Sequence, residues 1–170
     1  MKPTKHQTVR KSKRAELMSK SRSGYPRMPW AVVYFKRHHD DDPAQPTPGR
    51  DFLRNDCPPK VRAEYFGLID TIAGYPPPAF RGGGFWESMK MPGYYQAKLD
   101  GDEGEGRTGR MHFRLFCLLE REAPGLPGPS LVVICGMKKP YMTLFTEREY
   151  DSVRLLGEEY RARSPRSIAS

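Results

Sequence analysis

The chain has 170 residues, of which 37% are hydrophobic, with 17 prolines and 16 glycines. This length fits one domain with a modest core and long loops, and it can bury that core without disulfide staples. No apolar run approaches the roughly 18 residues of a membrane span, which excludes an integral membrane protein. No apolar stretch follows the basic N-terminus, so we expect no secretory signal.

The positive charge is concentrated at the N-terminus. The net charge is +9, but residues 1–29 hold nine Lys and Arg against one acid, Glu16, so that the rest of the chain is nearly neutral. Without apolar periodicity, residues 1–29 are predicted to be a disordered basic arm. Such an arm can attract phosphate in a salt-sensitive way, although a solvated leader explains the same composition.

Neither the cysteines nor the histidines predict a metal or a cofactor. Three cysteines cannot form a full disulfide framework and none lies in a CxxC pair, which favours a reducing cytosol. Cys117 and Cys135 are predicted to be buried core thiols on neighbouring strands. His38 and His39 precede three Asp residues in a Pro-rich stretch, which we interpret as an ordinary loop because adjacent residues seldom converge on one ion.

The first half of the chain predicts one strand and two helical segments. Residues 30–35 are β-branched and aromatic, as in a strand, and residues 51–54 read as one helical turn. Residues 57–72 then predict an amphipathic helix, in which Gly67 allows a break. Its apolar stripe consists of Val61, Tyr65, Leu68 and Ile72.

Three strands follow a Gly-rich connection over residues 79–93. They are predicted at residues 94–99, 111–119 and 130–137, with a flexible hairpin loop over residues 100–110. Strands joined by loops in this way are most simply antiparallel neighbours.

A well-marked helix ends the domain. Thr146 and Glu149 form a capping box, and Phe145 is placed to pack on Tyr150. The predicted fold is an α+β domain over residues 30–163, followed by a short tail at 164–170. It has an antiparallel sheet of about four strands, with two helices from the N-terminal half and the C-terminal helix packed on one face.

The predicted strands carry cations. Lys98 and Arg114 lie in mid-strand, and Lys138 with Lys139 ends the last strand. Because Lys and Arg are almost never fully buried without a partner, they should reach an open or paired face. Neighbouring antiparallel strands would bring Lys98, Arg114 and Lys138 onto one face. One interpretation is that they are edge charges or ion pairs with acids such as Glu87.

The other interpretation is metal-independent cleavage of RNA. A base removes the proton of the ribose 2′-hydroxyl, cations stabilise a dianionic phosphorane, and an acid protonates the leaving 5′-oxygen. A lysine serves as the base only if its pKa is depressed, which crowding beside Arg114 favours. His112 and Tyr141 are then candidate proton donors or base-stacking groups.

Short motifs follow one another in the order of a known family. They are Phe52-Leu53, Pro58-Pro59-Lys60-Val61-Arg62-Ala63, Tyr94-Tyr95-Gln96-Ala97-Lys98, Phe113-Arg114-Leu115-Phe116 and Gly136-Met137-Lys138-Lys139, before a capped helix. With these motifs the chain resembles the RelE/ParE toxin superfamily, in particular its HigB-like and phage-derived branch. The resemblance implies a RelE-like fold and the toxin of a type II toxin–antitoxin system, a ribosome-dependent mRNA endoribonuclease.

The resemblance also implies site residues. Lys98 stands at the Arg of the family's Glu-Leu-Arg strand, where a guanidinium would bind bidentately, and Gln96 replaces the usual Glu. An alternative alignment places Glu87 on this motif and Met89 at the Arg position. The candidate catalytic residues are Lys98, Arg114, Lys138, Lys139 and His112, and the candidate RNA contacts are Tyr94, Tyr141 and Lys90.

The partners implied by the resemblance are a cognate antitoxin, often a helix-turn-helix protein, and the ribosome with its mRNA in the cytoplasm. No membrane partner is expected. The alternative is a non-catalytic protein of this fold, either a gyrase-directed inhibitor of the ParE kind or a phage-derived binding protein. The near balance of charge after residue 29 favours this alternative, since a ribosome partner rewards positive charge.

Overall fold

The computed structural model describes residues 29–75, 77, 84–103 and 109–169, so nearly all of the predicted basic arm lies outside the described residues. The elements are β1 (Ala31–Tyr34), α2 (Pro48–Asp51), η1 (Phe52–Asp56), α3 (Pro59–Ala73), β2 (Trp86–Ser88), β3 (Tyr94–Asp102), β4 (Arg110–Glu120), β5 (Ser130–Pro140) and α4 (Glu147–Arg161). α2 is one α-helical turn that continues into the π-helical turn η1.

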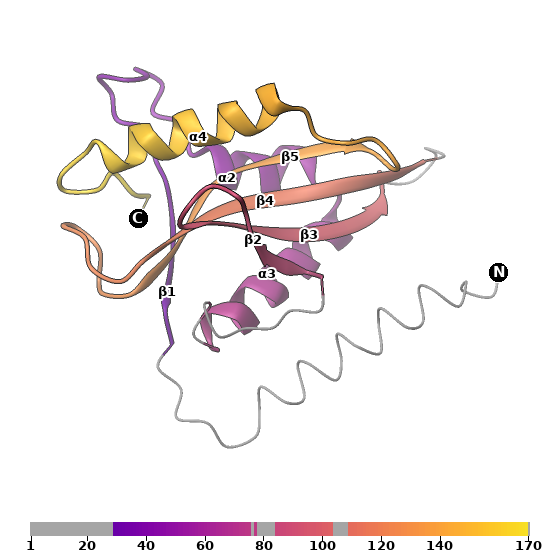
Figure 1. The fold of residues 1–170 in the computed structure, drawn as a ribbon, viewed down its shortest axis with the longest axis horizontal. Coiled ribbons are helices and arrows are strands. Elements are labelled where there is room, and N and C mark those ends of the chain that lie inside the picture. Colours follow the sequence, from indigo (N-terminus) through magenta and orange to yellow (C-terminus); the bar gives the residue numbers. More distant parts are fainter. Residues whose placement is uncertain (1–28, 76, 78–83, 104–108, 170) are drawn as a thin grey trace.

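One five-stranded sheet forms the centre of the fold, in the order β1-β5-β4-β3-β2 (Figure 1). β2, β3, β4 and β5 pair antiparallel, whereas β1 pairs parallel to β5. The predicted α+β class is confirmed. The prediction of about four strands, all antiparallel, is wrong: β2 lies within the segment read as a loop, and β1 reaches β5 across a long connection, which permits parallel pairing.

Helices cover both faces of the sheet, not one as predicted. α3 lies under one face and α4 over the other (Figure 1), and we call these the α3 face and the α4 face. The reason lies in β4, which is apolar on both sides. Its side chains Phe113 and Leu115 join the α3-face cluster, while Phe116 and Leu118 join the α4-face cluster. A strand with two apolar faces needs cover on each.

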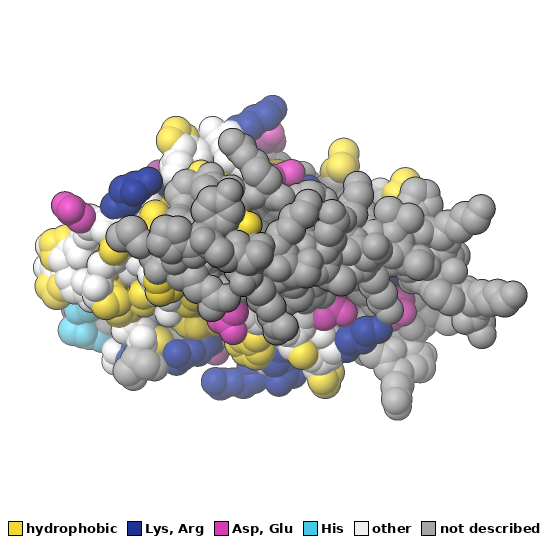
Figure 2. All heavy atoms as spheres, turned by 90° about the horizontal axis from the view of Figure 1, so that it is seen from below, with side chains coloured by type: hydrophobic (Ala, Val, Ile, Leu, Met, Phe, Trp, Pro, Cys, Tyr) yellow, Lys and Arg dark blue, Asp and Glu magenta, His cyan; other side chains and the backbone are white. Residues whose placement is uncertain are grey.

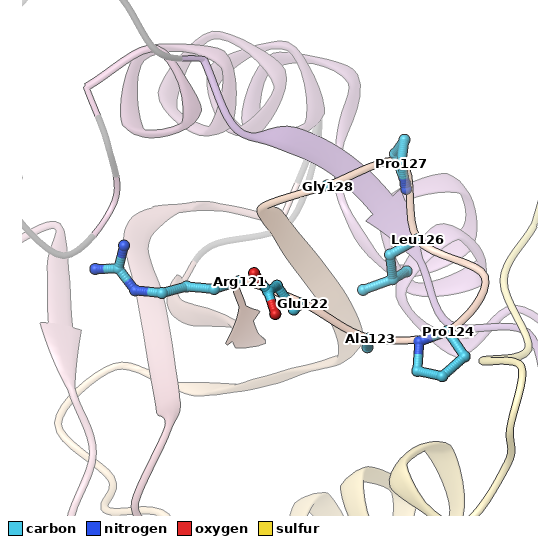
Figure 3. Close-up of a pocket in the computed structure, with 7 residues that line it drawn as sticks. All are labelled: Arg121, Glu122, Ala123, Pro124, Leu126, Pro127 and Gly128. Carbon is cyan, nitrogen blue, oxygen red and sulfur yellow. The ribbon is translucent and has the colours of Figure 1, made fainter.

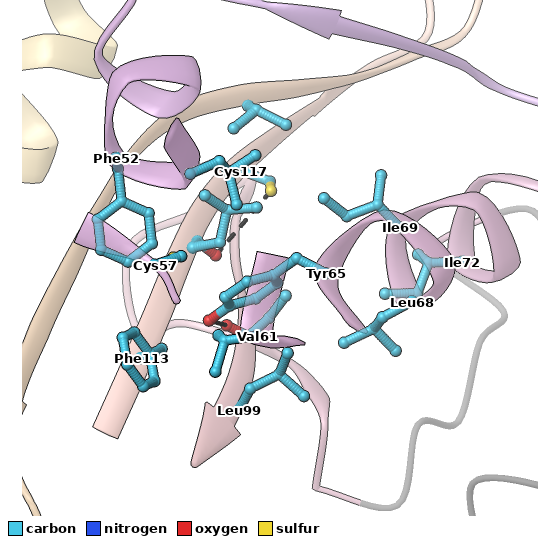
Figure 4. Close-up of a cluster of buried hydrophobic side chains, with 14 of the residues drawn as sticks. Phe52, Cys57, Val61, Tyr65, Leu68, Ile69, Ile72, Leu99, Phe113 and Cys117 are labelled. Carbon is cyan, nitrogen blue, oxygen red and sulfur yellow. Dashed lines mark hydrogen bonds between the residues drawn. The ribbon is translucent and has the colours of Figure 1, made fainter. Parts of the chain in front are cut away.

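The α3 face carries a continuous buried cluster (Figure 4). The predicted stripe of α3 is confirmed, since Val61, Tyr65, Leu68 and Ile72 are all buried, and the helix continues through Gly67 without a break. The Tyr65 hydroxyl donates to the Ala97 carbonyl at 3.3 Å, which pairs its one polar atom inside the cluster.

The α4 face is closed by the last helix and the residues after it. The capping box of Thr146 and Glu149 is confirmed, and the Phe145 and Tyr150 rings lie 6.3 Å apart. The segment predicted as a short tail returns along β1, where Ile168 forms a β-bridge with Phe35. These residues thereby pair with the C-terminal end of β1, where the Ala169 N–H donates to the Tyr34 carbonyl at 2.8 Å.

The three cysteines are free and buried, as predicted for Cys117 and Cys135. Burial raises the pKa of the Cys57 and Cys135 thiols to about 12 and that of Cys117 further still, so all three are neutral at physiological pH. Among the helices of the described residues, none combines the length and the apolar composition that crossing a bilayer requires.

Candidate functional site

Four of the predicted catalytic residues lie on the α4 face. The strand register places Lys98 of β3 directly opposite Arg114 of β4, and His112 of β4 opposite Lys139 of β5. Side chains that are paired across antiparallel strands point to the same side of a sheet. Lys98, Arg114, His112 and Lys139 therefore form one group beyond the apolar part of this face.

Lys138 lies on the opposite face, which corrects its predicted place beside Lys98 and Arg114. The cause is a bulge in β5: Phe116 pairs with Cys135 but the next residue, Cys117, pairs with Val133, so Ile134 is the extra residue. A one-residue bulge inverts the direction of every later side chain. Lys138 consequently pairs with Phe113 on the α3 face and forms an ion pair with Glu103.

Lys98 is bound by a carboxylate from the edge strand β2. Its ammonium lies 2.9 Å from Glu87, and the Gln96 side-chain amide donates to the same carboxylate at 2.6 Å. Partial burial raises the pKa of Glu87, but the hydrogen bond and charge of Lys98 outweigh it and hold that pKa below its ordinary value. Glu87 is therefore ionised at neutral pH.

Asp100 joins His112 and Arg114. Its carboxylate lies 2.7 Å from Nδ1 of His112 and 3.6 Å from the Arg114 guanidinium, which also donates to the Phe113 carbonyl at 2.8 Å. The side chains of Asp100, His112 and Arg114 are only 10–15% exposed. The low exposure strengthens these interactions relative to surface ion pairs.

Lys139 connects the sheet to the start of α4. Its ammonium lies 2.6 Å from the Glu149 carboxylate and donates to the Leu144 carbonyl at 2.7 Å. The hydrogen bond from Lys139 lowers the pKa of Glu149. The Phe145 ring lies within 6 Å of both the Lys139 ammonium and the Arg114 guanidinium, close enough for cation–π attraction to each.

Of the three predicted RNA contacts, only Tyr141 lies beside this group. Its ring is exposed, 4.8 Å from the His112 ring and 5.1 Å from the Arg110 guanidinium. Tyr94 is 3% exposed and donates its hydroxyl to a backbone carbonyl of α4, which removes it as an RNA contact. Lys90 is exposed, but it lies in the β2–β3 turn at the other end of β3.

We call the assembled cations and their carboxylates the ionic patch: Glu87, Lys98, Asp100, His112, Arg114, Lys139 and Glu149. Sequence reasoning found its cations but missed most of its acids. For Asp100 a signal existed, because it follows Lys98 by two residues and strand alternation puts both on one face. Figure 2 shows a different side of the molecule, seen from below and away from α4, where Lys and Arg also lie scattered among Asp and Glu.

Two cavities formed by described residues lie away from the ionic patch. One of about 480 Å³ is formed by the β4–β5 loop, where Arg121 extends away from Pro124 and Pro127 (Figure 3). Another of about 280 Å³ lies between η1 and α4, with Cys135 and Met137 of β5 among its lining residues. The second cavity is also lined by Asp51, Asn55, Asp56 and Ser152, but neither cavity includes a residue of the ionic patch.

Three potential metal ligands converge in the loop after β1, where the sequence predicts an ordinary loop. A nitrogen of each of His38 and His39 and a carboxylate oxygen of Asp40 lie within 4.8 Å of one another. Arg163 already contacts Asp40 at 3.4 Å, and Nδ1 of His38 accepts the Asp40 N–H at 3.2 Å. His39 also lies 2.9 Å from the Asp40 carboxylate, so contacts within the loop and with Arg163 account for its geometry.

Comparison of the chain with known protein families, with curated proteins and with solved structures finds no match.

Proposed function

We propose that the protein is the toxin of a type II toxin–antitoxin system. In this proposal it is a RelE-like endoribonuclease that cleaves mRNA on the ribosome, in the cytoplasm, without a metal ion. A cognate antitoxin, of the helix-turn-helix kind, holds it inactive. The ordered motifs support the family, and the α+β fold is compatible with it.

The observation that carries the proposal is the strand register. Lys98 lies directly opposite Arg114, and His112 lies next to this pair on the same half-buried face. A dianionic phosphorane needs two or more fixed cations within reach, in a site from which water is partly excluded. Lys98 and Arg114 meet this need, and His112 is the nearest group that can carry a proton.

In the proposed reaction, the phosphate of RNA replaces carboxylates in the ionic patch. It takes the place of Glu87 at Lys98 and of Asp100 at Arg114, so that each cation exchanges one anion for another and remains paired. The displaced Glu87 carboxylate accepts the proton of the 2′-hydroxyl as that oxygen attacks phosphorus, and Lys98 and Arg114 stabilise the phosphorane. Protonated His112 then gives its proton to the leaving 5′-oxygen. Tyr141, exposed beside His112, provides a ring on which a base can stack.

Brief expression in a bacterial host tests this function. Cells that make the native chain should stop growing and translating, and mapping of RNA 5′ ends should show new cuts within coding regions. Arg114→Ala and Lys98→Ala should relieve the arrest while circular dichroism shows an unchanged fold. Lys138→Ala, on the α3 face, is the matched control and should remain toxic. Full toxicity of both Arg114→Ala and Lys98→Ala would show that the site is assigned wrongly.

One observation favours a non-catalytic protein as the second candidate. Every cation of the ionic patch already has a carboxylate within 4 Å, as expected of a stable binding surface. This candidate predicts no new RNA ends under the same expression. A gyrase-directed inhibitor would instead induce the DNA-damage response, and a phage-derived binding protein would induce neither.

A further inference from the structure

His112 occupies an unusual position, because both of its ring nitrogens have a partner of known chemistry. Nδ1 lies 2.7 Å from the Asp100 carboxylate, and Nε2 lies 3.1 Å from the backbone nitrogen of Met142. An ionised carboxylate only accepts hydrogen bonds, and a backbone N–H only donates. The partners therefore assign the ring as neutral, with its proton on Nδ1 and a lone pair on Nε2.

The residue that His112 holds lies in a strained turn. Met142 has a φ of 67°, in the left-handed region that non-glycine residues seldom adopt, and it is 81% exposed. The Thr143 N–H donates to the Pro140 carbonyl at 3.1 Å, which closes a tight turn between β5 and α4. The exposed Met142 side chain contributes little burial, so its N–H bond to His112 is a principal restraint on this residue.

We propose that His112 is a pH-operated latch on the β5–α4 turn. The neutral ring holds Met142 through Nε2. When Nε2 gains a proton, it can no longer accept the Met142 N–H and faces it with a second N–H, so the bond breaks and the turn loosens. The ring, still held by Asp100 through Nδ1, then carries a proton on Nε2 that Met142 no longer covers. If the proposed ribonuclease function holds, Nε2 donates this proton to the leaving 5′-oxygen of the RNA.

Charged groups from three strands surround the His112 ring. Asp100 of β3 lies 2.7 Å from Nδ1, Arg114 of β4 lies on the same side of the sheet, and Lys139 of β5 stands opposite His112. Arg110 lies beyond the Tyr141 ring, which separates it from His112. The ion pair of Lys139 stays intact through the range in which histidine titrates, because the pKa of its partner Glu149 is lowered.

Nuclear magnetic resonance of the full chain, titrated from pH 8 to pH 5, tests the latch. At pH 8 the ring nitrogens should show the Nδ1–H tautomer, with a coupling across the hydrogen bond between Nε2 and the Met142 nitrogen. The Met142 amide should shift with the same midpoint as the His112 ring. Its protection from exchange should fall about tenfold for each pH unit below that midpoint, as a one-proton equilibrium requires.

Two variants keep the test decisive. His112→Gln offers Met142 an uncharged acceptor, so the Met142 amide should become independent of pH. Asp100→Asn removes the negative charge beside Nδ1 and should move the release to lower pH. A Met142 amide that ignores the titration of His112, or an Nε2–H tautomer at pH 8, would overturn the latch. These measurements use no RNA, so they test the latch independently of the ribonuclease activity.

Discussion

The two faces of the sheet use the same strands for different purposes. On β4, Phe113 and Leu115 are fully buried on the α3 face, whereas their neighbours His112 and Arg114 on the α4 face are partly exposed and bound to Asp100. The α3 face is thus apolar where α3 packs on it, with the ion pair of Lys138 and Glu103 beyond this cluster. The α4 face is apolar only where α4 covers it, and beyond that cover it is ionic. The ionic patch therefore lies on one face of the sheet, where the start of α4 contributes Glu149.

Substitutions on the α3 face are expected to have the largest effect on the free energy of unfolding. Phe113→Ala empties a fully buried position and should lower the free energy of unfolding by about 3–5 kcal/mol. Arg114→Ala, one residue later on the other face, removes a largely buried ion pair and should cost about 1–3 kcal/mol. Urea unfolding measures both free energies. Equal losses in the two variants would contradict the division into an apolar α3 face and an ionic part of the α4 face.

A smaller loss in the free energy of unfolding is expected at the end of the α4 face that α4 covers. Glu120 accepts from the Tyr160 hydroxyl at 2.5 Å and from the Arg166 guanidinium at 3.1 Å, with only 11% of its side chain exposed. Glu120→Gln removes the charge that holds both and should cost about 1–3 kcal/mol. The exposed Glu122→Gln is the matched control and should stay within about 0.5 kcal/mol of the native chain. If the two variants have similar thermal unfolding temperatures, the hydrogen bonds of Tyr160 and Arg166 to Glu120 do not stabilise the fold.

The buried cysteines of the two faces make the stability of the fold depend on pH. Burial raises the pKa of Cys57 on the α3 face from 9.0 to about 12, and that of Cys135 on the α4 face likewise. A raised pKa favours the protonated native state. The resulting stability is complete below pH 9 and is lost as pH rises from about 9 towards 12. Native thiols should therefore resist a disulfide reagent at pH 8 and react at once in urea. Rapid labelling of the native chain would contradict the burial of these thiols.

The smallest effect concerns the ionic patch itself. Lys98→Met removes the ammonium that lowers the pKa of Glu87 and should raise that pKa, as followed by the carboxyl carbon resonance during an acid titration. Lys90→Met, in the adjoining turn, should leave Glu87 unchanged. If the Glu87 resonance titrates alike in both variants, the Lys98–Glu87 pair does not persist in solution.

Most helices and strands could be predicted from the sequence, but which elements and side chains pack together could not. The helix over Pro59–Ala73 and the capping box before α4 follow from residues three or four apart, and both are confirmed. β2 was missed because three residues in a Gly-rich segment carry no periodicity. The burial of Tyr94 was missed because α4, more than fifty residues later, supplies its cover at Gly157. The grouping of Lys98 with Arg114 was predicted, and its carboxylate partners largely were not.

The amino-acid sequence by itself determined which segments become helices and strands, since spacing, caps and turn residues act within a few positions of one another. Only the tertiary structure decided which face each cation occupies and which acid it meets. A single extra residue in β5 sends Lys138 to the α3 face and Lys139 to the α4 face. Such a bulge is set by how β4 and β5 fit together, because register belongs to the pair of strands and not to either one alone.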